Sequence, residues 1–208
     1  MTSTVDESWD RILDWLARHA PATLKRIGPP AADADIAAAE EAVGAELPAD
    51  LVAWWRRADG SASSWSHQRF GLLPGYAPCR IEHALDRRKV WWQIWHDQML
   101  ERGWLTEKDF TRAQANPAGT EAGMWLLAFL PIASSGGGAD LFVDLRCGPR
   151  HGCVREFDKV STDGEPRWGS VTAMLADIAD ALENHATIGG YDARPNEDGV
   201  LSWDLKVD

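Results

Sequence analysis

The sequence predicts an α+β fold, in which a single domain contains a mainly antiparallel sheet packed by helices. Two observations predict this class. Apolar residues recur every three or four positions through most of the N-terminal half, which is the period of amphipathic helices. In the C-terminal half, apolar runs of strand length are bounded by Gly and Pro, and a helical pattern then returns. Helices followed by strands and a further helix are typical of α+β domains.

Short helices are predicted in the N-terminal part of the chain at residues 7–18, 34–43 and 49–57. Asp33 or Asp35 can accept hydrogen bonds from the first free amides of the second helix. Gly44 suits the left-handed residue that follows a helix end, and Pro48 fits the first turn of the next helix, where its missing N–H costs nothing. The pattern therefore predicts two short helices packed through a tight joint.

A long helix is predicted over residues 81–102, where apolar side chains are spaced by threes and fours. Before it, a segment rich in Ser, Gly and Pro contains one short strand, formed by Phe70, Leu72 and Leu73. After it, Thr106 begins a Thr-Glu-Lys-Asp sequence that resembles a capping box, with Asp in place of the usual Glu or Gln. We therefore expect a second, short helix there.

The chain contains twelve tryptophans, more than Phe and Tyr together. Trp combines a large apolar face with one donor, so it suits both cores and recognition surfaces, and most of these residues should lie in the core. Trp91, Trp92 and Trp95 are spaced widely enough to surround their helix. At least one of them is therefore expected at the surface, where it could line a binding site.

Strands are predicted at residues 125–131, 141–145 and 154–158. Cys147 and Cys153 bracket a turn rich in Gly and Pro, so the last two strands should form a hairpin. An amphipathic helix follows at residues 169–184, and one last strand is expected within residues 198–205.

The composition predicts a cytoplasmic protein with one domain spanning residues 1–208, as a monomer or weak dimer. The formal net charge of −11 argues against binding to nucleic acid and favours a basic protein partner. Plain solubility explains the same charge equally well. No apolar run approaches the ~20 residues needed to span a bilayer, so no membrane association is expected. The N-terminus also lacks a secretory signal.

No catalytic or cofactor motif is found in the sequence. The loop of residues 134–138 lacks the Lys of a P-loop and runs into a strand, so it does not predict a phosphate site. Cys147, His151 and Cys153 straddle one turn, whereas zinc knuckles use paired Cys spacings of about two to four. We therefore expect no enzyme activity, no metal and no cofactor.

Two segments resemble the SMI1/KNR4 family of the SUKH superfamily: residues 29–60 and the LPIASSGGGAD sequence that begins at Leu130. The positions that carry the resemblance are Trp9, Pro29, Pro30, Ile36, Glu40, Gly44, Leu47, Pro48, Leu51, Asp59, Gly60, Pro131, Ile132, Gly138, Asp140, Val154 and Phe157. Ala139, between Gly138 and Asp140, departs from the family pattern. The region of about residues 81–120 is interpreted as a family-variable helical insert.

The resemblance implies an immunity protein of a bacterial polymorphic toxin system, which binds and neutralises a basic toxin such as a nuclease. A regulatory or scaffolding module linked to cell-wall synthesis or signalling is one alternative, and a small-ligand binder or enzyme that uses the Trp-rich region is another. The candidate partner-binding residues are Asp59, Gly60, Trp65, Trp91, Trp92, Trp95, Ser134, Ser135 and Asp140. A simpler interpretation is that Asp59 and Gly60 end a helix and that Asp140 fixes its own turn.

Overall fold

The computed structural model describes residues 3–61 and 71–206, and the predictions for Trp65 and Phe70 fall outside them. The helices are α1 (Val5–His19), α2 (Pro21–Leu24), α3 (Asp33–Val43), α4 (Ala49–Arg57), α5 (Ile81–Trp92), the π-helix η1 (Gln93–Asp97), α6 (Gln98–Glu101), α7 (Glu107–Ala115) and α8 (Val171–Asn184). The strands are β1 (Ala77–Pro78), β2 (Phe129–Ser134), β3 (Ala139–Asp144), β4 (Val154–Asp158), β5 (Thr162–Asp163), β6 (Tyr191–Pro195) and β7 (Leu201–Leu205).

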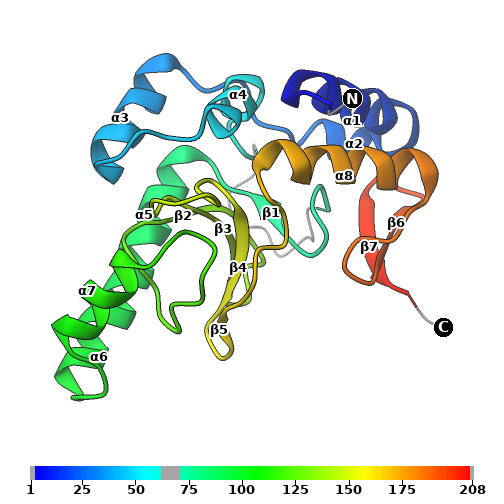
Figure 1. Cartoon of the computed structure of the whole chain (residues 1–208). Coiled ribbons are helices and arrows are strands. Elements are labelled where there is room, and N and C mark those ends of the chain that lie inside the picture. Colours follow the sequence, from blue (N-terminus) through cyan, green and yellow to red (C-terminus); the bar gives the residue numbers. More distant parts are fainter. Residues whose placement is uncertain (1–2, 62–70, 207–208) are drawn as a thin grey trace.

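The strands confirm the predicted α+β class. One antiparallel sheet has the order β1-β2-β3-β4-β5, and β6 and β7 form a separate hairpin (Figure 1). The hairpin predicted around the turn between Cys147 and Cys153 is confirmed, since β3 pairs with β4 in antiparallel register. The β6–β7 hairpin was only half predicted, because the sequence of β6, YDARP, has neither an apolar run nor a regular apolar alternation.

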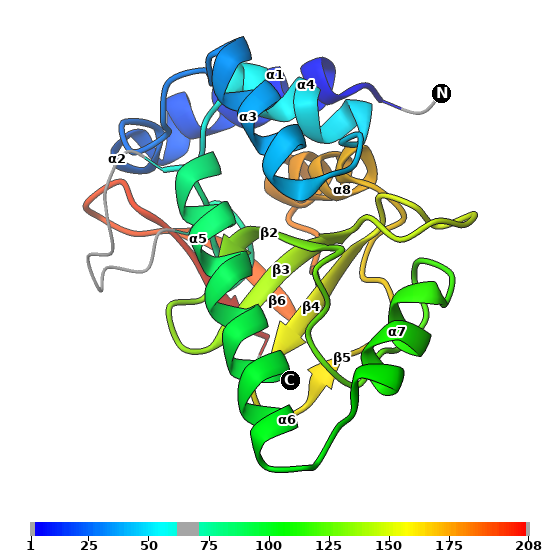
Figure 2. The same cartoon turned by 90° about the vertical axis from the view of Figure 1, so that its left-hand side faces the viewer.

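Each face of the central sheet carries its own apolar core (Figures 1 and 2). On one face, residues of α1, α4 and α8 cluster with Leu141 and Val143 of β3. On the other face, residues of α5 and α7 cluster with Phe142 of β3 and Phe157 of β4. Successive side chains of a strand point to opposite faces, so Asp140 and Asp144 share the face of Phe142. This second face holds most of the residues discussed below.

Two predicted strands differ from the structure. The run that begins at Trp125 starts with a turn, in which Phe129 N–H donates to the Leu126 carbonyl and Leu127 is exposed, and β2 begins only at Phe129. A short continuous apolar run does not by itself distinguish a turn from a strand. Leu72 and Leu73 also lie in a turn, where Leu73 forms an isolated bridge with Tyr76.

The helix boundaries follow local chemistry closely. Gly44 ends α3 in the predicted left-handed conformation, with φ of 72°, and Thr106 opens α7 with the predicted capping box. Ala32, rather than an Asp, occupies the N-cap of α3, and Asp33 and Asp35 lie in its first turn. There the carboxylates still act favourably on the helix dipole.

Candidate functional site

The N-terminus of α5 is fixed by the joint that follows α4. Asp59 is buried, and its Oδ1 accepts a hydrogen bond from Ile81 N–H at 2.7 Å. Its Oδ2 also lies 3.2 Å from Arg80 Nε. Gly60 has φ of 63°, and a Cβ at this position would lie 2.4 Å from the Cys79 backbone. Asp59 and Gly60 therefore fix the position where α5 begins, and their contact with a partner stays a prediction.

A second anchor ties the middle of α5 to the sheet. The Asp140 side chain on β3 is fully buried. It accepts hydrogen bonds from Arg87 Nε at 2.9 Å, from Arg87 Nη2 at 2.7 Å and from Trp91 Nε1 at 2.5 Å. The structure thus brings together Trp91 and Asp140, two predicted site residues, but as a buried joint. These bonds give Asp140 a positioning role in the fold, and its contact with a partner stays a prediction.

Ser134 and Ser135 shape the loop that leads into β3. Ser134 is buried and lies opposite Asp140 in the β2–β3 register. The exposed Ser135 accepts hydrogen bonds through its Oγ from Gly137 N–H at 3.1 Å and Ala139 N–H at 3.2 Å. These bonds fix the conformation of the loop, and Ser135 itself is exposed at the surface.

The tryptophans of the 81–102 region enter a cluster of aromatic rings, here called the aromatic cluster. Its members are Trp91, Trp92, Trp95, Phe110, Trp125, Phe129, Phe142 and Phe157. Trp91 is buried and stacks on Trp125 with ring centroids 5.8 Å apart. Trp92 and Trp95 are half-buried, so their outer edges are the parts that a partner could reach.

Trp104 is the most exposed of the tryptophans that the structure describes. Its relative exposure is 66%, the Arg102 guanidinium lies over its ring at 5.0 Å, and its backbone N–H donates to the Met99 carbonyl. Trp104 is not among the residues that the sequence predicts at a partner surface. Its position just after Gly103, beyond the regular helical spacing, is a signal that could have identified it.

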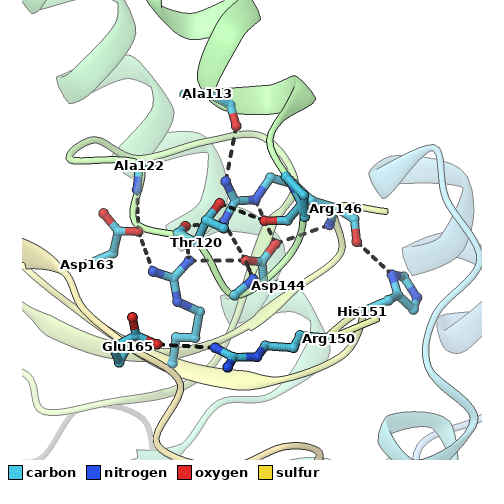
Figure 3. Close-up of polar contacts among 12 residues, drawn as sticks. Ala113, Thr120, Ala122, Asp144, Arg146, Arg150, His151, Asp163 and Glu165 are labelled. Carbon is cyan, nitrogen blue, oxygen red and sulfur yellow. Dashed lines mark hydrogen bonds and ion pairs between the residues drawn. The ribbon is translucent and has the colours of Figure 1, made fainter. Parts of the chain in front are cut away.

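A buried ion network occupies the opposite end of the same sheet face. It consists of Asp144, Arg146, Arg155 and Asp163, whose side chains are fully buried (Figure 3). Asp144 Oδ2 lies 2.7 Å from Arg146 Nη2 and 3.1 Å from Arg155 Nη1. Arg155 Nη2 also lies 2.7 Å from Asp163 Oδ2. Two carboxylates thus balance two guanidiniums away from water.

Backbone groups complete the buried ion network. Arg146 and Arg155 both donate to the Thr120 carbonyl, at 2.6 and 3.1 Å, and Gly119 N–H donates to Asp144 at 2.9 Å. Although burial acts to raise the pKa of Asp144, the bonds from Arg146 and Gly119 hold it below its ordinary value. The network therefore secures the loop before β2 to the sheet.

The surface beside α5 is slightly hollowed. A hollow of about 300 Å³ is lined by His83, Asp86, Arg87, Val90, Trp91 and Ile94.

Among the described residues, no group of three or more His, Cys, Asp or Glu side chains is arranged to hold a metal ion. Within the same residues, no helix combines the length and apolar character that a membrane crossing requires.

The structure is an α+β domain in which α5 is tied to the rest of the fold by the buried residues Asp59 and Asp140. The segment from α5 to α7 carries partly exposed tryptophans. The sequence matches the SMI1/KNR4 family (SUKH-1) over residues 30–177, and the chain belongs to that family. No curated protein matches the chain. Members of the family are generally not enzymes, and membership implies protein–protein interaction in general.

Proposed function

We propose that this protein is a non-enzymatic immunity protein that binds and neutralises a cognate bacterial toxin, a basic domain such as a nuclease. The family match over residues 30–177 carries the proposal, because the SUKH superfamily is best known for such immunity proteins. In this proposal the protein acts in the cytoplasm as a monomer or weak dimer. It needs no metal or cofactor and does not bind nucleic acid.

The charge of the chain supports a basic partner. The formal net charge is −11, and nuclease domains that grip phosphates tend to be basic. Opposite charges raise the rate of encounter, and the effect weakens as salt screens the fields. Binding should therefore become slower in high salt.

The proposed contact surface is the helical insert, taken as about residues 81–120 of a single domain spanning residues 1–208. Exposed aromatic side chains held in one conformation supply binding energy at low entropic cost. Trp104 is exposed and lies against the Arg102 guanidinium, and the edges of Trp92 and Trp95 extend the same region. Trp65 remains a predicted contact residue, and so does Ser135 in the loop that leads into β3.

The test is binding of this protein to the product of the gene beside its own, at low and high salt. Trp104→Ala should weaken the affinity about tenfold or more, as expected for an aromatic hot spot. Leu205→Ala, at a side chain that is 65% exposed on β7, is the control and should leave the affinity unchanged. Co-expression of the protein should also protect cells from the toxicity of the neighbouring product.

Absence of both binding and protection would reject the immunity function. Binding that Trp104→Ala leaves unchanged would keep the function and reject the insert as its contact surface.

A further inference from the structure

His96 lies between two carboxylates from different elements. Its Nδ1 is 2.9 Å from Asp97 Oδ1 within η1, and its Nε2 is 3.2 Å from Glu107 at the start of α7. The imidazole also stacks on Trp92, with ring centroids 4.2 Å apart, and tilts against Phe110 at 4.9 Å. The ring thus joins α5 and η1 to α7.

The two contacts together require the protonated ring. A neutral imidazole has one N–H and one acceptor nitrogen, whereas ionised carboxylates only accept hydrogen bonds. Neutral His96 can therefore donate to Asp97 or to Glu107, but not to both. Loss of the proton leaves a lone pair facing a carboxylate, which is repulsive.

We propose that His96, Asp97 and Glu107 form a pH-sensitive clasp that holds α7 against η1 when His96 is protonated and releases Glu107 when it is not. The proposal depends on the protein alone and does not rest on the immunity function. The clasp adds to the apolar contacts of Phe110 and Ala113, which are buried and do not depend on the charge of His96. Release is therefore a local opening rather than unfolding of the insert.

The clasp joins the two ends of the segment that carries Trp104. Residues 96 and 107 are these two ends, and α6 and the turn at Gly103 lie between them (Figure 2). Within this segment, the N–H groups of Trp104 and Leu105 both donate to the Met99 carbonyl. When the contact between His96 and Glu107 is lost, the segment between them is less constrained and its conformational entropy rises. The two hydrogen bonds to the Met99 carbonyl should therefore break more often.

The direction of the pH effect follows from the charges on the ring. The charged groups that act on His96 are Asp97 from η1 and Glu107 from α7, and α5 contributes the uncharged ring of Trp92. Burial alone would lower the pKa of His96, but these carboxylates raise it above the ordinary value of about 6.5. The clasp is thus complete below the ordinary pKa and is lost as the pH rises through the folded-state pKa.

The experiment combines two NMR measurements on the full chain. The first follows the His96 ring signal, assigned by its loss in His96→Gln, through a pH titration. It should titrate above the ordinary histidine value, and Glu107→Gln should lower its midpoint. The matched control is Glu101→Gln, which removes an exposed carboxylate of α6 and should shift the midpoint less.

The second measurement is amide hydrogen exchange of Trp104 and Leu105, one pH unit below and above the His96 midpoint. Protection factors, which remove the intrinsic pH dependence of exchange, should fall several-fold across the titration in the wild type. In Glu107→Ala, which removes the hydrogen-bonding group, they should be low at both pH values. A His96 midpoint that Glu107→Gln does not move, or protection that stays constant across the titration, would overturn the clasp.

Discussion

Asp140 and Asp144 project from the same face of β3, both side chains are fully buried, and both are bonded to guanidinium groups. Their surroundings differ. Asp144 faces Arg146 and Arg155, which are themselves fully buried, whereas Arg87, the partner of Asp140, keeps 19% of its side chain exposed. One end of the strand is therefore a closed structural joint, and the other connects the sheet to a helix that reaches the surface.

The comparison also shows how burial assigns roles to similar residues. A buried charge that loses its partner is costly, because the remaining charge has no access to water. At the Asp144 end, every charged side chain of the network is fully buried, so the loss of any one of them leaves a charge without access to water. At the Asp140 end a small side-chain movement can hydrate Arg87, so that end should tolerate change better.

The largest expected effect comes from Asp144→Ala. It leaves Arg146 and Arg155 buried with a single carboxylate, so the free energy of unfolding should fall by about 3–5 kcal/mol. Urea unfolding measures this loss. Glu165→Ala, which removes the exposed pair with Arg150, is the control and should change stability by less than about 1 kcal/mol. If the two variants lose similar stability, the Asp144 end is not a closed joint.

A smaller loss is expected from Asp140→Asn. The amide keeps the size of the side chain and can still accept from Trp91 N–H, while Arg87 turns toward water. The free energy of unfolding should fall by about 1–3 kcal/mol, and Trp fluorescence should report a local shift of α5. A loss as large as that of Asp144→Ala would show that the two ends of β3 are equally closed.

The smallest effect is expected from Thr106→Ala, at one end of α7. Its capping box opens this helix, while the Ala113 carbonyl near the other end accepts from Arg146. Loss of the cap should cost about 1 kcal/mol and should speed amide exchange in the first turn of α7. Exchange should stay unchanged near Ala113. Equal acceleration at both ends would mean that α7 responds as one rigid unit.

Much of the fold could be predicted because local chemistry determines it. The end of α3 at Gly44, the capping box at Thr106 and the strand at residues 154–158 each depend on residues within one turn or one strand. Family resemblance then ordered these elements correctly over most of the chain.

The long-range polar contacts could not be predicted in the same way. Arg87 and Asp140 are 53 positions apart, and Arg155 meets Asp144 across 11 positions. Either carboxylate could have been an exposed turn residue on sequence alone, which is why Asp140 was expected at a partner surface. The π-helical segment that turns His96 toward α7 likewise has no signature in the spacing of apolar residues.

The presence of a separate apolar core on each face of the sheet has a consequence for how this protein can evolve. Substitutions at well-separated sites that share no contacts tend to act independently on stability. Changes on the outer surface of η1, α6 and α7 should therefore leave the packing of α1, α4 and α8 on the other face unaffected. Such a scaffold can accept new surface residues on one side of the sheet while the packing on the other side stays the same.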